Sequence, residues 1–270
     1  PMMEENSIAA IENNVFGTKN LLDAALESGT EKFVLISTDK AVEPVSVYGA
    51  SKMLCEKLVI QAAQKAKKNQ AFMFVRFGNV LGSRGSILPI FMEQIQNGGP
   101  VTVTDPQMER YFMTIPEACS LVLQTGGVGT NGASYLLDMG EPIKILELAK
   151  QVIKFSGFTP DKEIKIQFIG ARKGERLEEP LWLKEENPEP TEYKKILKLT
   201  NISPKNFSLD ELINSLKPIC VLSKGKEELY RNSGELKKIL RKAVPTLDEF
   251  YKHEENASEK NKKSYAKAVL

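Results

Sequence analysis

The feature that most constrains this chain is a short apolar run that ends in polar residues and is followed by a helix. Residues 32–37, Lys-Phe-Val-Leu-Ile-Ser, have the length and composition of a buried β-strand. Residues 38–40, Thr-Asp-Lys, then lie beyond the carboxyl end of that strand, where open α/β sheets place their chemistry. Tyr48 and Lys52 follow at a spacing of four, so they share one helix face, where the lysine ammonium favours the phenolate. Alternating helix and strand patterns elsewhere predict an α/β fold.

The composition of the 270 residues excludes several classes of protein. With 41% hydrophobic residues, 27% charged residues and a net charge of +2, the chain offers no basic surface for nucleic acid. No apolar run approaches the roughly 18 residues that span a bilayer. The single histidine, His253, lies in a charged tail, so we expect neither a Ser-His-Asp hydrolase nor a metal site. Three scattered cysteines favour a reducing compartment, and we expect a cytoplasmic protein.

Further periodic stretches extend the α/β pattern along the chain. Apolar residues recur at helical spacing from Ser7 to Glu27, and Gly29 marks a stop. Thr114 followed by Glu117 is a helix start signal. The other expected elements are strands at 71–76 and 163–168, helices at 144–155, 229–240 and 247–251, and a disordered tail at 253–267.

Residues 127–132, Gly-Val-Gly-Thr-Asn-Gly, match the Gly-x-Gly-x-x-Gly pattern letter for letter. The dinucleotide fingerprint follows a strand and opens a helix, so that the helix N-terminus faces the phosphates. Here a helical stretch ends near Gln124 and a strand begins at Ser134, which reverses that order. We therefore interpret 127–132 as a helix-to-strand loop and not as a cofactor site.

Three longer segments resemble the UDP-N-acetylglucosamine 4,6-dehydratases of the extended short-chain dehydrogenase/reductase superfamily. These are residues 37–52, 76–86 and 111–118, with weaker similarity at 138–142 and 174–176. The resemblance implies the C-terminal part of a Rossmann-type doubly wound parallel sheet, a smaller mixed α/β substrate region and a helical C-terminal extension. The expected divisions are 1–125 for the dinucleotide-binding domain, with a substrate-binding insertion around 82–110, then 126–203 for the UDP-sugar region and 204–270 for the extension.

The family opens with a strand, a Gly-rich turn and a helix that hold the dinucleotide pyrophosphate, and this chain shows no such opening. Its start, residues 1–6, resembles the loop after the fourth strand of these enzymes. We therefore expect a fragment that lacks roughly the first half of the dinucleotide fold and has little activity alone. The cofactor is NAD or NADP, because the ribose-reading residue would lie upstream. The resemblance implies a homo-oligomeric parent enzyme and leaves its membrane anchoring open.

The resemblance also assigns roles to individual residues. The catalytic group is Thr38, Asp39, Lys40, Tyr48 and Lys52. The cofactor group is Ser37, Tyr48, Lys52, Phe77 and Gly78. The substrate group is Asn79, Arg84, Gly85, Ser86, Val103, Arg110, Arg172 and Glu175. One departure stands among these motifs, because the family usually has Pro where this chain has Lys173.

The adjacent acid and amine favour a dehydratase, since an elimination needs a base and an acid close together. In the implied reaction, Tyr48 or Thr38 accepts the C4 hydroxyl proton of UDP-N-acetylglucosamine or a similar UDP-sugar. Lys40 removes the C5 proton and Asp39 protonates the departing C6 hydroxyl. The product is a UDP-4-keto-6-deoxy-HexNAc for bacterial polysaccharide or glycan synthesis, with the C5 configuration retained or inverted. Two alternatives remain open: a UDP-sugar epimerase of the same superfamily, and a non-catalytic UDP-sugar-binding fragment.

Overall fold

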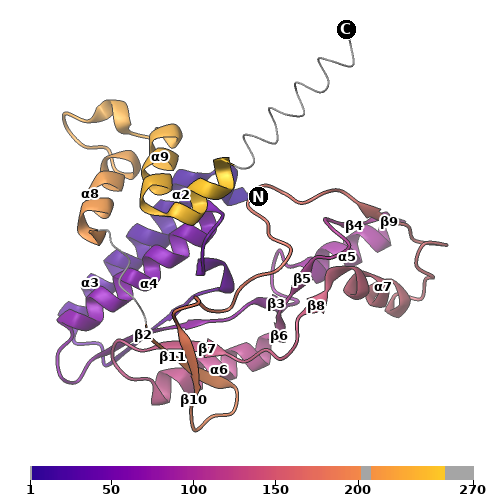
Figure 1. The fold of residues 1–270 in the computed structure, drawn as a ribbon, viewed down its shortest axis with the longest axis horizontal. Helices are drawn as coiled ribbons and strands as arrows, with labels where there is room; N and C mark the ends of the chain where they lie inside the picture. Colours follow the sequence, from indigo (N-terminus) through magenta and orange to yellow (C-terminus); the bar gives the residue numbers. More distant parts are fainter. Residues whose placement is uncertain (1, 202–207, 253–270) are drawn as a thin grey trace.

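The computed structural model describes residues 2–201 and 208–252, and its centre is a five-stranded sheet in the order β1-β2-β7-β11-β10 (Figure 1). The parallel strands are β1 (Lys32–Ile36), β2 (Ala71–Arg76) and β7 (Ser134–Leu137), and the antiparallel ones are β11 (Ile196–Thr200) and β10 (Asn187–Pro190). Every residue of β2 is buried, as its apolar sequence predicts. Strand β1 pairs only with β2 among the described residues and is half-buried, whereas its sequence predicted a buried strand.

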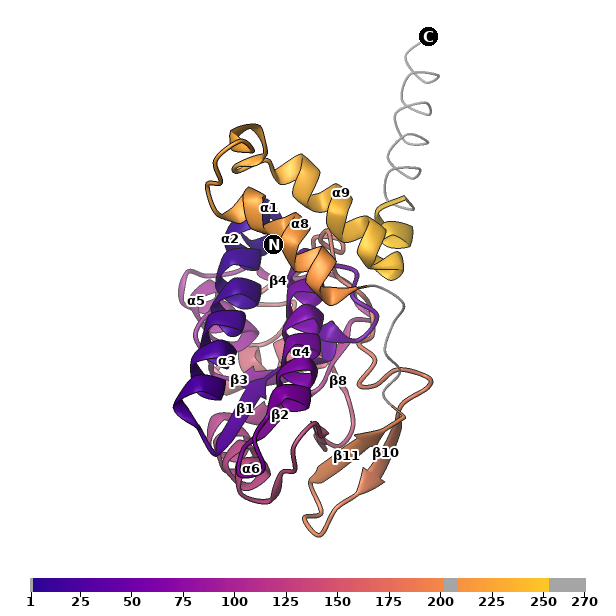
Figure 2. The same cartoon turned by 90° about the vertical axis from the view of Figure 1, so that its left-hand side faces the viewer.

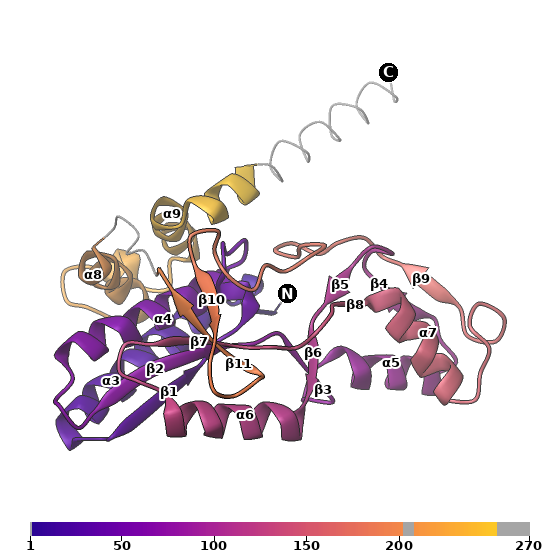
Figure 3. The same ribbon diagram turned by 60° about the horizontal axis from the view of Figure 1, so that its bottom comes forward.

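Helices cover both faces of this sheet (Figure 3). Helices α3 (Gly17–Ser28) and α4 (Val47–Lys65) lie on one face, and α6 (Ile115–Val128) lies on the other. Alternate residues of β2 serve the two sides, because Phe72 and Phe74 pack with α4 whereas Met73 and Val75 pack with α6. The sheet and its two helical layers confirm the predicted α/β fold class.

The caps of these helices follow from their sequences. The Ser46 hydroxyl accepts a bond from the Gly49 amide at 3.0 Å and starts α4, and Thr114 caps α6 as predicted. The helix predicted from Ser7 is present but interrupted, because α2 (Ser7–Ile11) passes through a π-helical turn, η1 (Glu12–Phe16), before α3. It ends where Gly29 adopts φ 75°.

The C-terminal residues add a fourth layer outside α2 and α4 (Figure 2). This layer contains α8 (Leu209–Cys220), a short turn η3 (Glu227–Leu229), α9 (Ser233–Ala243) and a helical stretch at 245–252. The sequence predicted the last two helices approximately but missed α8. Its signal was present, because Ser208 caps it by accepting a bond from the Glu211 amide. The tail predicted at 253–267 lies outside the described residues.

A second lobe extends away from the C-terminal helices (Figure 1). Its elements are α5 (Ile87–Gln96), α7 (Ile145–Phe155) and the parallel strands β4 (Val101–Val103) and β9 (Ile166–Phe168), around a separate hydrophobic cluster. The strand expected at 163–168 therefore forms only over its last three residues. Two short ladders join the lobe to the sheet: β3 (Asn79–Leu81) with β6 (Phe112–Thr114), and β5 (Glu109–Arg110) with β8 (Ile143–Lys144).

The structure divides the chain differently from the boundary expected at residue 126. Strands β7, β10 and β11 lie beyond that boundary but belong to the main sheet. Residues 145–168 pack instead with residues 87–112 in the second lobe. Sequence order does not separate the two lobes, because the chain crosses between them more than once.

Candidate active site

A chain of polar side chains lies at the carboxyl end of β1, where the sequence predicted it. Thr38 caps a single 3-10 turn (Asp39–Ala41), and its hydroxyl donates to Asp39 Oδ1 at 2.8 Å. The Lys40 ammonium donates to the same Asp39 oxygen at 2.9 Å. The neighbouring α4 packs against this turn at Gly49, where an added Cβ would lie 2.2 Å from the Lys40 carbonyl oxygen. Only glycine allows the Tyr48 helix to approach so closely.

The Tyr48 phenol joins this group beside the Thr38 side chain. Burial raises the pKa of the Tyr48 phenol, and the cation that partly offsets this is Lys40. The sequence had suggested Lys52 for that influence. Instead, the Lys52 ammonium donates to the Ile36 carbonyl oxygen at 2.7 Å and lies at the exposed edge of the site. Tyr48 and Lys52 therefore both lie on α4 as predicted, but the cation that acts on the phenol is Lys40, from the turn after β1.

Asp39 is the most deeply placed of these groups and has no exposed surface. Its Oδ2 atom finds no hydrogen-bond partner among the described residues. Gly78 encloses it, because a Cβ there would lie 3.1 Å from Asp39 Oδ2 and 3.0 Å from the Tyr111 carbonyl oxygen. A buried carboxylate is costly unless it is paired, and Lys40 supplies the pairing here. The partly exposed Lys40 therefore lies between the buried Asp39 carboxylate and solvent.

The structure adds one acidic residue that sequence reasoning missed. Glu179 is 8% exposed, and its Oε1 atom lies 3.8 Å from Lys40 Nζ and 3.7 Å from Arg110 Nη2. Burial raises the pKa of this carboxyl, while Lys40 partly lowers it again. The only signal in the sequence was its position four residues after Glu175, in the same segment as the predicted nucleotide contacts.

The raised pKa of Glu179 predicts a specific dependence of stability on pH. A carboxyl that binds its proton more tightly in the folded state stabilises the fold below its ordinary pKa of 4.5, and this contribution is lost as pH rises through the folded-state pKa. Glu179→Gln should therefore become progressively more stable relative to the wild type as pH rises above 4.5. Urea unfolding at a series of pH values measures the difference.

A control with the opposite sign is available for this experiment. The Thr159 hydrogen bonds lower the pKa of the exposed Glu163 carboxyl, so Glu163→Gln should lose stability relative to the wild type as pH rises through the folded-state pKa. Parallel curves for the wild type and Glu179→Gln would contradict the assignment of the buried acid.

Beside Lys40 the chain forms a cleft of about 390 Å³ between the sheet and the second lobe. Lys40 and Glu179 are among the residues that line it. All eight residues predicted to contact substrate line the same cleft: Asn79, Arg84, Gly85, Ser86, Val103, Arg110, Arg172 and Glu175. They come from four separate segments, so the fold brings together residues that only a resemblance had grouped.

Ser86 and Arg172 have polar groups available to a ligand, whereas the Arg110 guanidinium is already hydrogen-bonded within the protein. Ser86 precedes α5, and its buried hydroxyl has no partner among the described residues, so it can accept or donate toward the cleft. The backbone amide of the exposed Arg172 donates to the Glu175 carboxylate at 2.9 Å, so the Arg172 guanidinium can make other contacts. Arg110 instead donates to three backbone carbonyl oxygens, including those of Arg176 and Leu177, and so braces the 176–177 segment.

Two residues of the predicted cofactor group point into the protein. The Ser37 hydroxyl donates to Glu56 Oε1 at 2.6 Å, and Phe77 is buried in the cluster beneath α6. Glu56 also receives two bonds from Arg76, whose third bond runs to Glu186 at 2.7 Å. This buried network ties the ends of β1 and β2 to α4 and to the segment beyond Glu179. Ser37 therefore positions the strand end in this structure.

The described residues fit the nicotinamide end of a dinucleotide and not its pyrophosphate. The Tyr48 phenol, the exposed Lys52 ammonium and the orphaned Asp39 oxygen lie at one edge of β1. Helix α6 continues to Val128, beyond the end expected near Gln124, so the pattern at 127–132 begins in its last turn. The order is still helix then strand, as predicted, so this pattern cannot present a helix N-terminus to phosphates. Within the described ranges no three acidic, Cys or His side chains gather as metal ligands would, and no helix is long and apolar enough to cross a membrane.

The parallel sheet with its polar carboxyl edge and adjoining cleft defines a Rossmann-type protein of the extended short-chain dehydrogenase/reductase class. Residues 1–201 match the family described as polysaccharide biosynthesis protein, and the chain belongs to that family. Capsular polysaccharide biosynthesis protein CapD of Staphylococcus aureus is 52% identical over 196 residues, which are 73% of this chain and 32% of CapD. UDP-glucose 4-epimerase of Rickettsia canadensis is 40% identical over 182 residues, 67% of this chain and 52% of the epimerase. The chain thus spans about a third to a half of these relatives.

Solved structures support the same fold. Pen from Bacillus thuringiensis superimposes with a TM-score of 0.67 at 30% identity, covering 79% of this chain and 70% of Pen. DesIV, a dTDP-glucose 4,6-dehydratase of Streptomyces venezuelae with NAD and TYD bound, superimposes with a TM-score of 0.58 at 23% identity. That match covers 66% of this chain and 61% of DesIV.

Proposed function

We propose that this chain carries the nucleotide-sugar site and the proton-transfer groups of a UDP-N-acetylglucosamine 4,6-dehydratase that uses NAD or NADP. The observation that carries the proposal is the continuity of the polar chain with the cleft. Thr38, Asp39 and Lys40 are linked by successive hydrogen bonds, the Tyr48 phenol lies beside Thr38, and Lys40 lines the cleft together with the predicted nucleotide contacts. Lys40 thereby places the proton-transfer groups at the cleft that the predicted nucleotide contacts line.

This protein has a side chain for each proton transfer in the proposed reaction. The nicotinamide, when bound beside Tyr48 and Lys52, supplies a reversible hydride acceptor. The Tyr48 phenol and Thr38 hydroxyl take up the C4 hydroxyl proton, and Lys40 takes the C5 proton. The C6 hydroxyl leaves as water after it receives a proton from a carboxylic acid.

Two carboxyl groups compete for that last role. Asp39, the acid that the sequence predicts, is completely buried and reaches the cleft only through Lys40. Glu179 lines the cleft directly, and its raised pKa favours the protonated form that an acid catalyst needs. Lys40 lies between the two acids, so a proton taken from C5 can be passed to either side.

A UDP-sugar epimerase is the second candidate, favoured by the 40% identity to the Rickettsia canadensis enzyme. An epimerase needs no acid for a departing hydroxyl, so a charged pair such as Asp39–Lys40 would have no elimination to serve. The product decides between the two functions. A dehydratase yields a 4-keto sugar that absorbs in alkali, whereas an epimerase yields only the other configuration.

The experiment compares the 270-residue chain with the protein encoded by its complete reading frame. Because the described residues hold no pyrophosphate turn, we expect the chain alone to bind UDP in calorimetry but not to release a keto sugar from UDP-N-acetylglucosamine. The protein encoded by the complete reading frame should release it with NAD or NADP. Robust turnover by the 270-residue chain alone would refute the prediction that it binds UDP without catalysis. Failure of both proteins to bind UDP would refute the proposed nucleotide-sugar site.

A further inference from the structure

Lys173, the residue that departs from the family pattern, contacts the C-terminal helices. Its ammonium lies 4.4 Å from the centroid of the Tyr251 ring, within the range of a cation–π interaction. Lys173 sits between Arg172 and Gly174, both of which line the cleft. Tyr251 lies beyond residues 1–201, the part that matches the family. The contact therefore joins the nucleotide side of the cleft to a part of this chain outside the family match.

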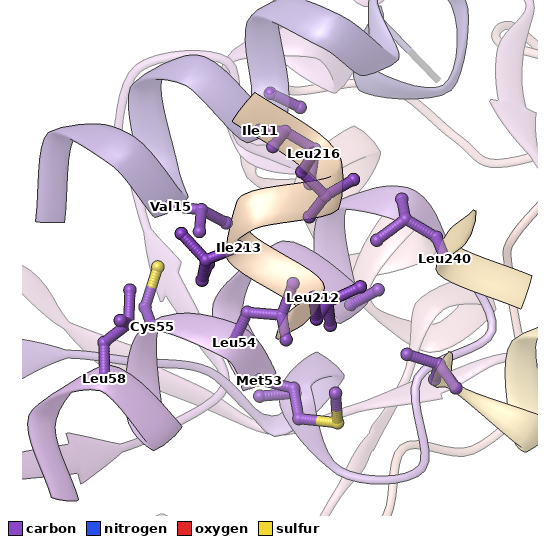
Figure 4. Close-up of a cluster of buried hydrophobic side chains, with 14 of the residues drawn as sticks. Ile11, Val15, Met53, Leu54, Cys55, Leu58, Leu212, Ile213, Leu216 and Leu240 are labelled. Carbon is purple, nitrogen blue, oxygen red and sulfur yellow. The ribbon is translucent and has the colours of Figure 1, made fainter. Parts of the chain in front are cut away.

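Tyr251 is a fixed point for such a contact. It is 4% exposed and belongs to the hydrophobic cluster that seats the C-terminal helices on α2 and α4. Figure 4 shows the heart of that cluster, where Leu212, Leu216 and Leu240 of the C-terminal helices meet Ile11 and Leu54. Anchoring of this kind keeps the aromatic ring in one place while Lys173 rests against it.

The Tyr251 hydroxyl reaches a second element of the site. It donates to one carboxylate oxygen of Glu4, and the other oxygen of Glu4 accepts the amide of Val47, the first residue of α4. Tyr48 follows directly on that helix. One aromatic residue thus contacts the cleft loop directly and is linked through Glu4 to the start of the helix that carries the phenol.

Three segments converge at this point. Gly174 has φ 78°, and a Cβ there would lie 2.9 Å from Ser46 Cβ, so the cleft loop packs directly on the cap of α4. Arg176 donates to the Val42 carbonyl oxygen at 3.2 Å. From the C-terminal helices, Thr246 donates to the Pro44 carbonyl oxygen at 2.9 Å. The C-terminal layer is therefore bonded to the segments that hold the site in place.

We propose that Tyr251 is a positioning residue of the nucleotide-sugar site, whose ring fixes Lys173 and thereby places Arg172 and Glu175 at the cleft. This inference rests on the proposed function, since it assumes that the cleft takes a nucleoside diphosphate. A loop that is already ordered loses less conformational freedom when the ligand binds, so the contact strengthens binding without touching the ligand.

The test measures UDP binding to the 270-residue chain by calorimetry. Tyr251→Leu and Lys173→Met should each weaken UDP binding about fivefold to tenfold, the range expected for a partly desolvated cation–π contact. The double variant should bind no more weakly than Tyr251→Leu, because Tyr251→Leu already removes the contact that Lys173→Met removes. Tyr251→Phe keeps the ring and should restore binding to within about twofold of the wild type.

A matched control comes from the same extension. Arg231 lies 5.3 Å from the Tyr230 ring and its guanidinium donates to Glu12, and none of these three residues lines the cleft. Tyr230→Leu should leave UDP binding unchanged. Hydrogen–deuterium exchange of residues 172–177 should accelerate in Tyr251→Leu and not in Tyr230→Leu.

The outcomes separate this inference from the proposed function. If the wild type binds UDP and folded Tyr251→Leu shows the same affinity and the same exchange rates, Tyr251 has no positioning role. The proposed function would then still stand. Absence of UDP binding in the wild type overturns the proposed site, and the exchange comparison still decides whether Tyr251 orders the loop. Full additivity in the double variant also counts against the inference, because it would mean that the two side chains act separately.

Discussion

Replacing Asp39 and Lys40 together, as Asp39→Asn with Lys40→Met, is expected to lower keto-sugar formation by the protein encoded by the complete reading frame about 10²- to 10⁴-fold. That is the range over which positioned acid–base groups accelerate reactions. The double change is preferable to Lys40→Met alone, since removing only the ammonium would leave Asp39 as a completely buried and unpaired charge. The measurement is the initial rate of alkali-absorbing product under saturating substrate.

Lys144→Met is the matched control for that loss. Lys144 also pairs with a carboxylate, with its ammonium 3.9 Å from Glu109 Oε1, but it is exposed and does not line the cleft. Its loss should leave turnover essentially unchanged. UDP binding by the Asp39→Asn/Lys40→Met chain should persist, because the changes remove one positive and one negative charge. Turnover above a tenth of the wild-type rate in the double variant would rule out Lys40 as the base.

Arg76→Met should cause the largest loss of stability of any single change considered. Arg76 makes two bonds to Glu56 and one to Glu186, and all three side chains are buried. Burial lowers the pKa of the guanidinium, but Glu56 and Glu186 together outweigh burial and raise it, so the guanidinium stays charged. Removal of the cation leaves two buried negative charges, and losing one partner of a buried pair costs about 3–5 kcal/mol. Urea unfolding followed by circular dichroism gives the change in the free energy of unfolding.

Replacing the two carboxylates that lose their partner in Arg76→Met, Glu56 and Glu186, provides an internal check. Glu56→Gln/Arg76→Met/Glu186→Gln removes all three charges and should recover a substantial part of the stability lost in Arg76→Met. Arg231→Met serves as the surface comparison, because Arg231 pairs with Glu12 at 2.8 Å in contact with solvent. If Arg76→Met were no more destabilising than Arg231→Met, the buried network would not be what secures the strand ends.

Several features of the fold were predictable because the signals are local. The apolar run of β2, the Thr114 cap of α6 and the Gly29 stop each depend on residues within one or two turns. Side-chain periodicity and capping act over such distances, so the α/β class follows from the sequence alone. The burial of β1 did not follow, since it depends on which strands lie beside it.

For the site, the sequence by itself determined which residues were available, namely the acid, the amine and the phenol after one strand and a set of possible nucleotide contacts. Only the tertiary structure decided how they are used. It placed Lys40 rather than Lys52 as the charge acting on the phenol, brought Glu179 to Lys40 from 139 positions away, and bonded Arg76 to Glu186 across 110 positions. It also set Tyr251 against Lys173. These pairings depend on burial and on contacts between distant segments, which no local pattern in a single sequence encodes.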